Sequence, residues 1–535
     1  MFRDETVKVE KRVRASWGMS DAASASSTST ITSSNASQSA PAKTKRSASI
    51  APTARSGASS IPTPPASVLS TSPVSTQSPP RIRESPSPTT PSAIQPGDLL
   101  QGSSWEALAL HSPVSTNPND LGLSFYVNHY ILGYPDEVKR GEDLSSELWF
   151  QSPASQATMT ALGLAGLGNL HNDNQLQLLS KVKYGEALAC TNQALREPLK
   201  NLDAAIRATI MLALYQCVRT THQSHGNVRV HLLGCMALIK SAIPIRSVPA
   251  MGIRGLLQLC YSLLVPCIQT GVGLPDNFFQ WVRDSGSSDF LPPDEKPGAT
   301  LAHIIARFAQ LNATIRNTAY TDGREPTARM LRQLVAVECD MKEWEASRAG
   351  KWQYQVHRHP ALPAEAVFRH QYHRYSDVWT SRIWNHFRWA RILTNQTILE
   401  QAERYPTSAA GIVSPGLRDR IHDTIRRLAA DVLTSAPTHY KHPRLTRAHL
   451  DIIQTHGGAG AGAVGIPHLM FQLQVAACAP GVPYGIWRWA LGVMETAWGE
   501  LGMMHVKSLA EVLRGHRPDA EGVGDEDADV DGERV

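Results

Sequence analysis

Apolar residues recur at three- and four-residue spacing along most of 116–515, which is the period of an amphipathic α-helix. The stretches that follow this pattern are 153–170, 174–197, 202–220, 228–242, 299–318, 324–346, 365–404, 417–435 and 483–514. Turn-forming residues interrupt it, for example HNDN at 171–174. Alternating β patterns are scarce. The pattern predicts an all-α fold, a large multi-helix domain of packed helical hairpins.

Aromatic residues are most dense in 372–405. One helical face of this stretch would hold Tyr372, Tyr375, Trp379, Ile383, Phe387, Ala390 and Leu393. Three further residues widen the face: Trp384, His386 and Trp389. Three arginines lie off it: Arg382, Arg388 and Arg391. A stacking platform for single-stranded nucleic acid would use such rings, but we favour a long central helix buried by its neighbours.

Two segments have the composition of disordered chain. Residues 18–115 are rich in Ser, Thr, Pro and Ala and poor in large apolar side chains, so burial could not offset the entropy of ordering them. We expect a disordered Ser/Thr/Pro-rich linker there and an acidic disordered tail at 516–535. The linker contains a short basic cluster, Lys43, Lys45 and Arg46, which is a candidate nuclear-localisation patch.

Residues 1–17 predict a basic amphipathic helix. Its apolar stripe consists of Phe2, Thr6, Val9, Val13 and Trp17. The basic residues that could contact phosphates or support dimerisation are Arg3, Lys8, Lys11, Arg12 and Arg14. A helix this short is marginally stable alone in water, so we expect it to pack on a partner helix or on another domain.

Composition narrows the function classes only slightly. The 535 residues include 52 basic and 47 acidic side chains, a net charge of +5, which does not by itself indicate nucleic-acid binding. The seven cysteines form no CxxC pair, and we expect buried free thiols in a reducing compartment. The most apolar run, 256–268, is too short to span a bilayer. We therefore expect an intracellular protein with no membrane partner.

Candidate catalytic and metal-binding motifs are weak. GAGAVG at 460–465 matches GxGxxG, and DIIQT before it could form a short strand, but no βαβ pattern surrounds them, so we predict a surface loop. The histidine cluster His357, His359, His370, His373 and His386 lacks the acids of a typical metal site, and we expect His373 to be packed in the interior. An all-helical enzyme such as a terpene cyclase would need paired acidic motifs, and 116–515 has none. We predict a non-enzyme with no cofactor in this chain.

Three stretches of the helical region carry short motifs in a definite order. HLLGCMALI (231–239) has an H-xx-G-xxAL pattern at His231, Gly234, Ala237 and Leu238. DVWTSRIWNHFRWARILTNQ (377–396) has a W-xx-R-xWNxxRxxRI-L pattern at Trp379, Arg382, Trp384, Asn385, Arg388, Arg391, Ile392 and Leu393. A helix pair with Gly502 and Ala510 closes the region at 487–513. Together these stretches resemble the fungal-specific regulatory domain of binuclear zinc-cluster (six-cysteine) transcription factors.

The opening segment is similar to the stretch that follows the zinc cluster in that family, where FRDE-xxKV introduces a basic helix. The matching residues are Phe2, Arg3, Asp4, Glu5, Lys8, Val9, Arg12 and Arg14. The cluster itself is missing, because no cysteine precedes Cys190. Either the cluster lies upstream of Met1, where zinc would then be expected, or the chain is a relative without one.

The resemblance implies a transcription regulator that acts in the nucleus, with shuttling through the cytoplasm left open, and that controls a metabolic or biosynthetic gene set. It would reach DNA through the missing cluster or through an intact partner, as a homo- or heterodimer, and 116–515 would contact the transcription machinery. Two alternatives stay open from the residues alone. One is a helical scaffold or effector-binding module that does not bind DNA, and the other is an all-helical enzyme.

Overall fold

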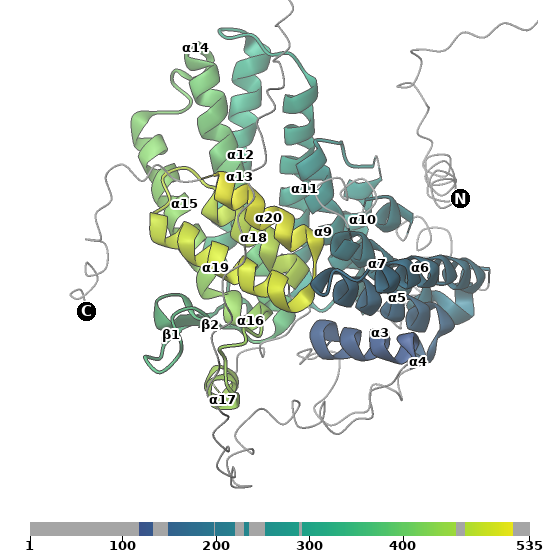
Figure 1. The fold of residues 1–535 in the computed structure, drawn as a ribbon. Helices are drawn as coiled ribbons and strands as arrows, with labels where there is room; N and C mark the ends of the chain where they lie inside the picture. The colour runs from purple at the N-terminus through teal and green to yellow at the C-terminus, as the bar shows by residue number, and fades with distance from the viewer. Residues whose placement is uncertain are drawn as a thin grey trace, which may run out of the picture. The chain divides into compact units, whose positions relative to one another are not determined.

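The computed structural model describes residues 117–131, 148–196, 198–219, 229–234, 252–275, 277–287, 291–455 and 466–516. Within these ranges the chain forms 17 α-helices and one two-stranded sheet (Figure 1). The predicted all-α fold is therefore confirmed. None of the described helices is both long enough and apolar enough to cross a membrane.

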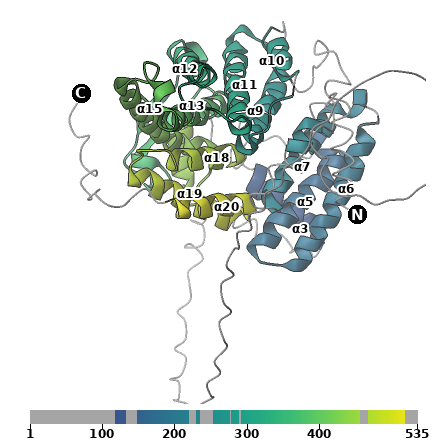
Figure 2. The same cartoon turned by 90° about the horizontal axis from the view of Figure 1, so that it is seen from above.

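The first group of helices is organised around α5. Its members are α3 (Pro118–Tyr126), the π-helix η2 (Val127–Ile131), α4 (Leu148–Gln151), α5 (Pro153–Leu170), α6 (Asn174–Ala194) and α7 (Pro198–Arg219). Helix α5 contacts α3, α6 and α7 (Figure 2), and 12 of its 18 residues are buried. Its many Ala and Gly residues permit this, since small side chains let neighbouring backbones approach closely. Asp173 then caps α6 by accepting from the backbone N–H groups of Gln175 and Leu176.

The helices of the second group pack in sequence against one another, and the last two, α11 and α12, contact α13 (Val378–Arg404). Its α-helices are α9 (Gly252–Thr270), α10 (Phe278–Ser287), α11 (Lys296–Asn317) and α12 (Glu325–Ala346). Three short 3₁₀ helices accompany them: η5 (Pro293–Glu295), η6 (Gly350–Trp352) and η7 (Phe368–His370). The apolar run 256–268 lies inside α9, where Leu257, Cys260 and Leu264 are fully buried.

The third group surrounds the longest helix, α13 (Val378–Arg404). The helices that follow it are α14 (Pro406–Ala409), α15 (Pro415–Thr434), α16 (Ala436–His439), α17 (Arg447–Thr455), α18 (Ile466–Ala477), α19 (Tyr484–Leu501) and α20 (Met504–Gly515). Helix α13 contacts α11, α12, α15 and α18, and 19 of its 27 residues are buried. The expectation of a long central helix buried by its neighbours is confirmed for this stretch.

The predicted helix over 365–404 is wrong in its first part. Residues 371–374 form strand β2 (Gln371–Arg374), which pairs antiparallel with β1 (Gln355–Arg358) in the register Gln355↔Arg374. The helix begins only after Asp377, whose carboxylate accepts a 2.6 Å hydrogen bond from the Thr380 backbone N–H. Asp is a favoured N-cap residue. Tyr372 and Tyr375 matched the helical spacing by coincidence, and they precede the helix.

The helix predicted over 483–514 is also interrupted. Gly502 adopts φ 60° and ends α19, and α20 begins two residues later. A side chain would be strained at this φ. A Cβ at Gly502 would also lie 2.1 Å from the backbone oxygen of Gly166 in α5, so the turn rests directly on the first helix group.

We expect Gly163→Ala to destabilise the fold by about 1–3 kcal/mol, the usual range for overpacking. A Cβ at Gly163 would lie 1.7 Å from the carbonyl oxygen of Gly122, and both groups belong to packed helix backbones. The measurement is the urea midpoint followed by helical circular dichroism. Gly492→Ala is the matched control, because nothing lies within 4 Å of that Cβ in α19, and it should stabilise by about 0.5–1 kcal/mol. Equal midpoints for the two variants would contradict the close contact of α3 and α5.

Candidate functional site

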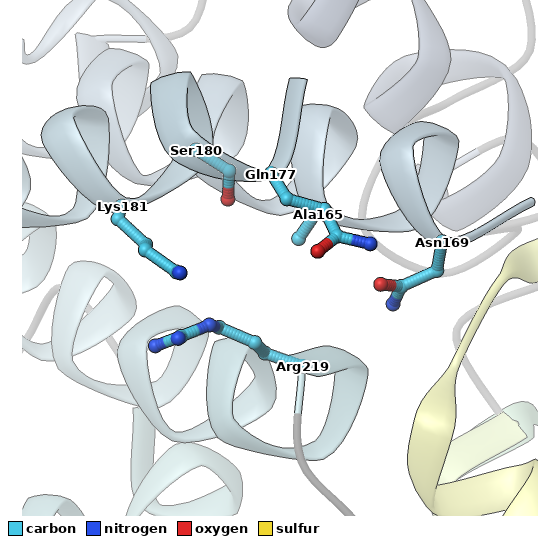
Figure 3. Close-up of a pocket in the computed structure, with 6 residues that line it drawn as sticks. All are labelled: Ala165, Asn169, Gln177, Ser180, Lys181 and Arg219. Carbon is cyan, nitrogen blue, oxygen red and sulfur yellow. The ribbon is translucent and has the colours of Figure 1, made fainter. Parts of the chain in front are cut away.

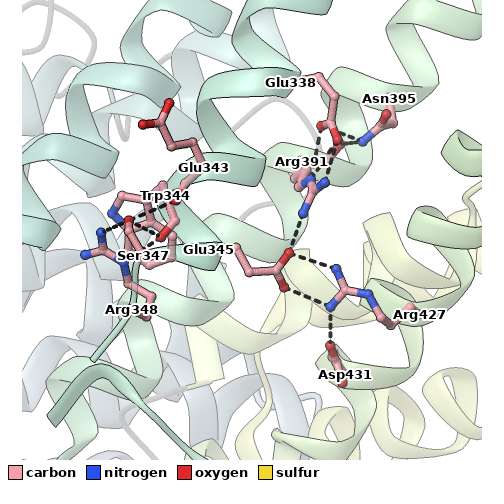
Figure 4. A network of polar contacts seen from close by, with 10 residues as sticks. All are labelled: Glu338, Glu343, Trp344, Glu345, Ser347, Arg348, Arg391, Asn395, Arg427 and Asp431. Carbon is pink, nitrogen blue, oxygen red and sulfur yellow. Dashed lines mark hydrogen bonds and ion pairs between the residues drawn. The ribbon is translucent and has the colours of Figure 1, made fainter. Parts of the chain in front are cut away.

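Helix α13 carries the central motif, and its Arg391 is held in a buried ion-pair network (Figure 4). The Arg391 side chain is only 4% exposed, and its Nε and Nη2 both donate to the Glu338 carboxylate of α12, at 2.9 Å and 2.6 Å. Its Nη1 donates to Glu345 at 2.6 Å. Asn395, one turn later, donates to Glu338 at 2.9 Å. A guanidinium fork suits such paired carboxylate contacts.

The same network extends to α15. Glu345 accepts from both terminal nitrogens of Arg427, at 2.8 Å and 3.0 Å, and Arg427 lies 3.4 Å from Asp431. Burial raises the pKa of Glu338, and Arg391 opposes that shift. Burial likewise raises the pKa of Asp431, and Arg388 and Arg427 oppose it. The carboxylates are therefore costly to bury, and the arginines offset that cost.

Arg388 is fully buried in an aromatic enclosure. Its Nη1 donates to the Tyr375 hydroxyl at 2.8 Å and to the Asn385 side-chain oxygen at 2.9 Å. The guanidinium carbon lies 5.0 Å from the ring centroid of Tyr354 and 5.6 Å from that of Trp384, within cation–π range. Burial opposes the charge, but Tyr375, Tyr354 and Asp431 leave the pKa of Arg388 above its ordinary value.

The tryptophans of the motif also make specific contacts. Trp379 Nε1 donates to the Glu295 carboxylate at 2.8 Å, and Trp384 Nε1 donates to the backbone oxygen of Trp352 at 2.9 Å. Both rings are buried, and Trp389 is completely buried. The face considered as a stacking platform for single-stranded nucleic acid is therefore inaccessible.

The sequence placed Arg382, Arg388 and Arg391 off the buried face, and the structure corrects this for two of them. Arg388 and Arg391 are buried, and Arg382 is half-buried. The reason is that α13 has neighbours on nearly every side, so little of its circumference is left for solvent. A one-sided helical projection could not show this.

The histidine cluster does not assemble into a metal site among the described residues. His373 is buried, as expected, but on strand β2, where its Nδ1 lies 2.9 Å from the Tyr375 hydroxyl and its Nε2 lies 3.6 Å from Asp431. His386 stacks on Tyr261, with ring centroids 4.5 Å apart. His357 stacks on Tyr372 in the hairpin. These three imidazoles thus have separate packing environments.

The described cysteines are free thiols, but they are not all buried. Cys260 and Cys267 lie in the core, and burial raises the pKa of Cys267 to about 11. Cys339 is exposed on α12, contrary to the expectation of buried thiols, because it lies on the side of that helix that faces away from the core. Cys235 lies outside the described residues.

A small cavity that sequence reasoning missed lies between α5, α6 and α7 (Figure 3). Its volume is about 140 Å³, and its lining consists of Ala165, Asn169, Gln177, Ser180, Lys181 and Arg219. The amine of Lys181 and the guanidinium of Arg219 point toward each other across it. The two cations come from different helices, 38 positions apart in the chain, so no local motif brings them together.

A buried polar network lies beneath the cavity and includes His231 of the HLLGCMALI motif. Ser180 Oγ lies 3.1 Å from the Tyr215 hydroxyl, and the Tyr215 ring stacks on Tyr184 at 4.3 Å. The Tyr184 hydroxyl accepts from Gln216 at 2.9 Å and lies 3.0 Å from His231 Nε2. Burial lowers the pKa of His231 to about 4, so the imidazole is neutral at physiological pH.

Several predicted features lie outside the described residues. These are the basic residues Arg3, Lys8, Lys11, Arg12 and Arg14, the patch Lys43, Lys45 and Arg46, the segments 1–17, 18–115 and 517–535, and the GAGAVG stretch at 460–465. The preceding DIIQT, considered as a strand, belongs to helix α17 instead. This removes the strand that a dinucleotide-binding loop would require.

Comparisons with known proteins returned no match, whether to a protein-family model, a curated protein or a solved structure.

We expect Arg391→Ala to destabilise the chain by about 3–5 kcal/mol, because it leaves the largely buried Glu338 without its arginine partner and removes one of the two arginines that pair with Glu345. Urea denaturation would measure this. Arg332→Ala is the matched control, since Arg332 pairs with Glu325 on the same network helix α12 but both side chains are at least half exposed, and it should cost less than about 1 kcal/mol. An Arg391 variant as stable as the control would mean that the network contributes nothing.

His231 should make stability depend on pH. Its pKa is about 4 in the folded chain and about 6.5 when unfolded, so between these values only the unfolded chain binds the proton. Stability is then complete above about pH 6.5 and falls as the pH is lowered toward about 4. Between about pH 7.5 and 5 the loss is about 2 kcal/mol.

The check is to compare urea midpoints at both pH values for the wild type and for His231→Gln, which keeps a polar partner for Tyr184. The variant should lose that part of the pH dependence. His516→Gln, at an exposed position after α20, should retain it. Identical pH dependence in all three proteins would rule out a buried neutral His231.

Proposed function

We propose that this chain is a transcription regulator of the fungal zinc-cluster type, with 116–515 as its regulatory and partner-binding domain. A metabolic or biosynthetic gene set is the proposed target. The chain would act in the nucleus and reach DNA through a zinc cluster upstream of Met1 or through an intact partner in a homo- or heterodimer. In this proposal it catalyses no reaction and holds no cofactor of its own.

The observation that carries the proposal is that most side chains of the central motif on α13 are buried and bonded inside the domain. Five polar or aromatic side chains of the motif make hydrogen bonds inside the domain: Trp379, Trp384, Asn385, Arg388 and Arg391. These side chains link α13 to several neighbours: Arg391 to α12, Arg388 to Tyr375 after β2, and the two tryptophans to η5 and η6. This supports the motif as the framework of a regulatory domain, because groups that served catalysis or bound nucleic acid directly would be open to a ligand.

A second candidate function is an effector-binding module with no role at DNA. The cavity between Lys181 and Arg219 favours it, because a polar, cationic cavity is suited to a small charged ligand. The two candidates differ in one consequence. Loss of a regulator changes transcript levels, whereas loss of a module that acts away from DNA leaves them unchanged.

The test is to fuse the full chain to a heterologous DNA-binding domain and to place a reporter gene under its binding site. We expect reporter expression to change several-fold in either direction, because the regulatory domain would contact the transcription machinery. Arg391→Ala should abolish the effect by disrupting the network, and Arg332→Ala, at an exposed position on α12, should preserve it.

The complementary measurement is RNA sequencing after deletion of the gene in its own host. A regulator predicts a defined set of altered transcripts. A silent reporter together with unchanged transcripts would overturn the proposal and favour the module that acts away from DNA.

A further inference from the structure

Two positive side chains face each other across the cavity between α5, α6 and α7. Figure 3 shows the Lys181 amine and the Arg219 guanidinium approaching the same space from α6 and α7. Among the described residues, no carboxylate lines the cavity and neither cation forms an ion pair. Lys181 is half-buried and Arg219 is exposed at the mouth of the cavity. An opposite charge placed between two cations is attracted by both, so the arrangement favours an anion.

Lys183 shows how a cation on the same helix is otherwise accommodated. It lies two residues from Lys181, but its amine is 2.7 Å from the carboxylate of Glu186, one turn further along α6. Its charge is thus already compensated. Lys181 has the same residue type on the same helix, yet its side chain is directed into the cavity (Figure 3).

Neutral polar groups complete the cavity. The amides of Gln177 and Asn169 and the hydroxyl of Ser180 line it. Ser180 is 1% exposed and is fixed by hydrogen bonds to the Ala161 carbonyl and the Tyr215 hydroxyl. Asn169 is fixed by donating to the backbone oxygens of Val218 and Gly502. These bonds hold Ser180 and Asn169 in place before any ligand binds, which reduces the cost of binding. They also use the hydroxyl proton of Ser180 and the amide N–H groups of Asn169, so the direct contacts to an anion come from Lys181 and Arg219.

The size and charge of the cavity define its ligand. Its volume of about 140 Å³ is close to that of an engineered cavity of about 150 Å³ that holds benzene, so it can accept an ion as large as phosphate. A guanidinium fork matches the oxygens of a phosphate group in pairs, and an ammonium adds a compact point charge.

We propose that this cavity binds a compact dianionic oxyanion, either inorganic phosphate or the phosphate group of a small metabolite, held between Lys181 and Arg219. The site rests on the geometry of the cavity and is independent of the proposed role in transcription.

The experiment is isothermal titration calorimetry of the full chain with inorganic phosphate and, separately, with glycerol 3-phosphate. We expect saturable binding at one site. Lys181→Gln and Arg219→Gln should each weaken it by about 10- to 100-fold, the usual value of a charged hydrogen bond. Arg219→Lys, which keeps the charge but loses the fork, should fall between Arg219→Gln and the wild type. Lys183→Gln should bind like the wild type.

The outcomes separate the two sources of the anion. Tighter binding of the ester than of free phosphate identifies a metabolite, and equal or weaker binding identifies phosphate itself. No saturable heat with either probe overturns the proposal, and so does an equal loss of affinity in Lys183→Gln, which would indicate diffuse surface charge. All variants replace side chains at the edge of the fold, so their urea midpoints should match the wild type, and Arg219→Lys provides a second test of the site if Arg219→Gln unfolds.

Discussion

The burial of α13 on nearly every side is the constraint on which the rest of the central region depends. A helix in that position would ordinarily be apolar all round, but α13 brings two guanidinium groups, Arg388 and Arg391, into the interior. A buried charge without a partner costs several kcal/mol. The neighbouring helices must therefore supply carboxylates and aromatic rings at matching positions, and α12 and α15 do so through Glu338, Glu345 and Asp431.

Because of this requirement, the network determines how α12, α13 and α15 align more than it adds to the net stability of the fold. Buried ion pairs contribute little compared with well-packed apolar residues, yet removal of one partner is costly. A shift of α12 by one turn along α13 would separate Arg391 from both Glu338 and Glu345. We infer that the network selects one alignment of α12, α13 and α15 among those that apolar packing alone would allow. The same logic applies to Arg388, whose enclosure by Tyr354 and Tyr375 ties the segments on either side of the hairpin to the helix.

Much of the helical framework could be predicted from the sequence, because amphipathic spacing and turn residues are local signals. The end of α5 and the start of α6 follow from the Asn and Asp residues between them. The predicted ranges 299–318, 324–346 and 417–435 agree with α11, α12 and α15 within a few residues. The hairpin of β1 and β2 was missed because its pairing joins residues 19 positions apart, as Gln355 and Arg374 are, and a helical projection registers Tyr372 and Tyr375 as continuous with α13. The burial of Arg388 and Arg391 was missed for a related reason, since only the neighbours of a helix determine how many of its faces are buried.

The cavity between α5, α6 and α7 could not be predicted from local patterns either, because its lining comes from three helices. Its lining is also connected to the rest of the fold. Asn169 lines the cavity and donates to the carbonyl of Gly502, in the turn between α19 and α20. That turn has no free space, because the position of a Cβ on Gly502 is occupied by the backbone of Gly166. The Tyr130 hydroxyl fixes the neighbouring carbonyl of Leu501 at 2.6 Å. Helix α20 in turn contacts α18, which packs on α13. The hydrogen bond of Asn169 to Gly502 therefore ties the cavity lining to the α19–α20 turn, and α20 is linked to the central helix through α18.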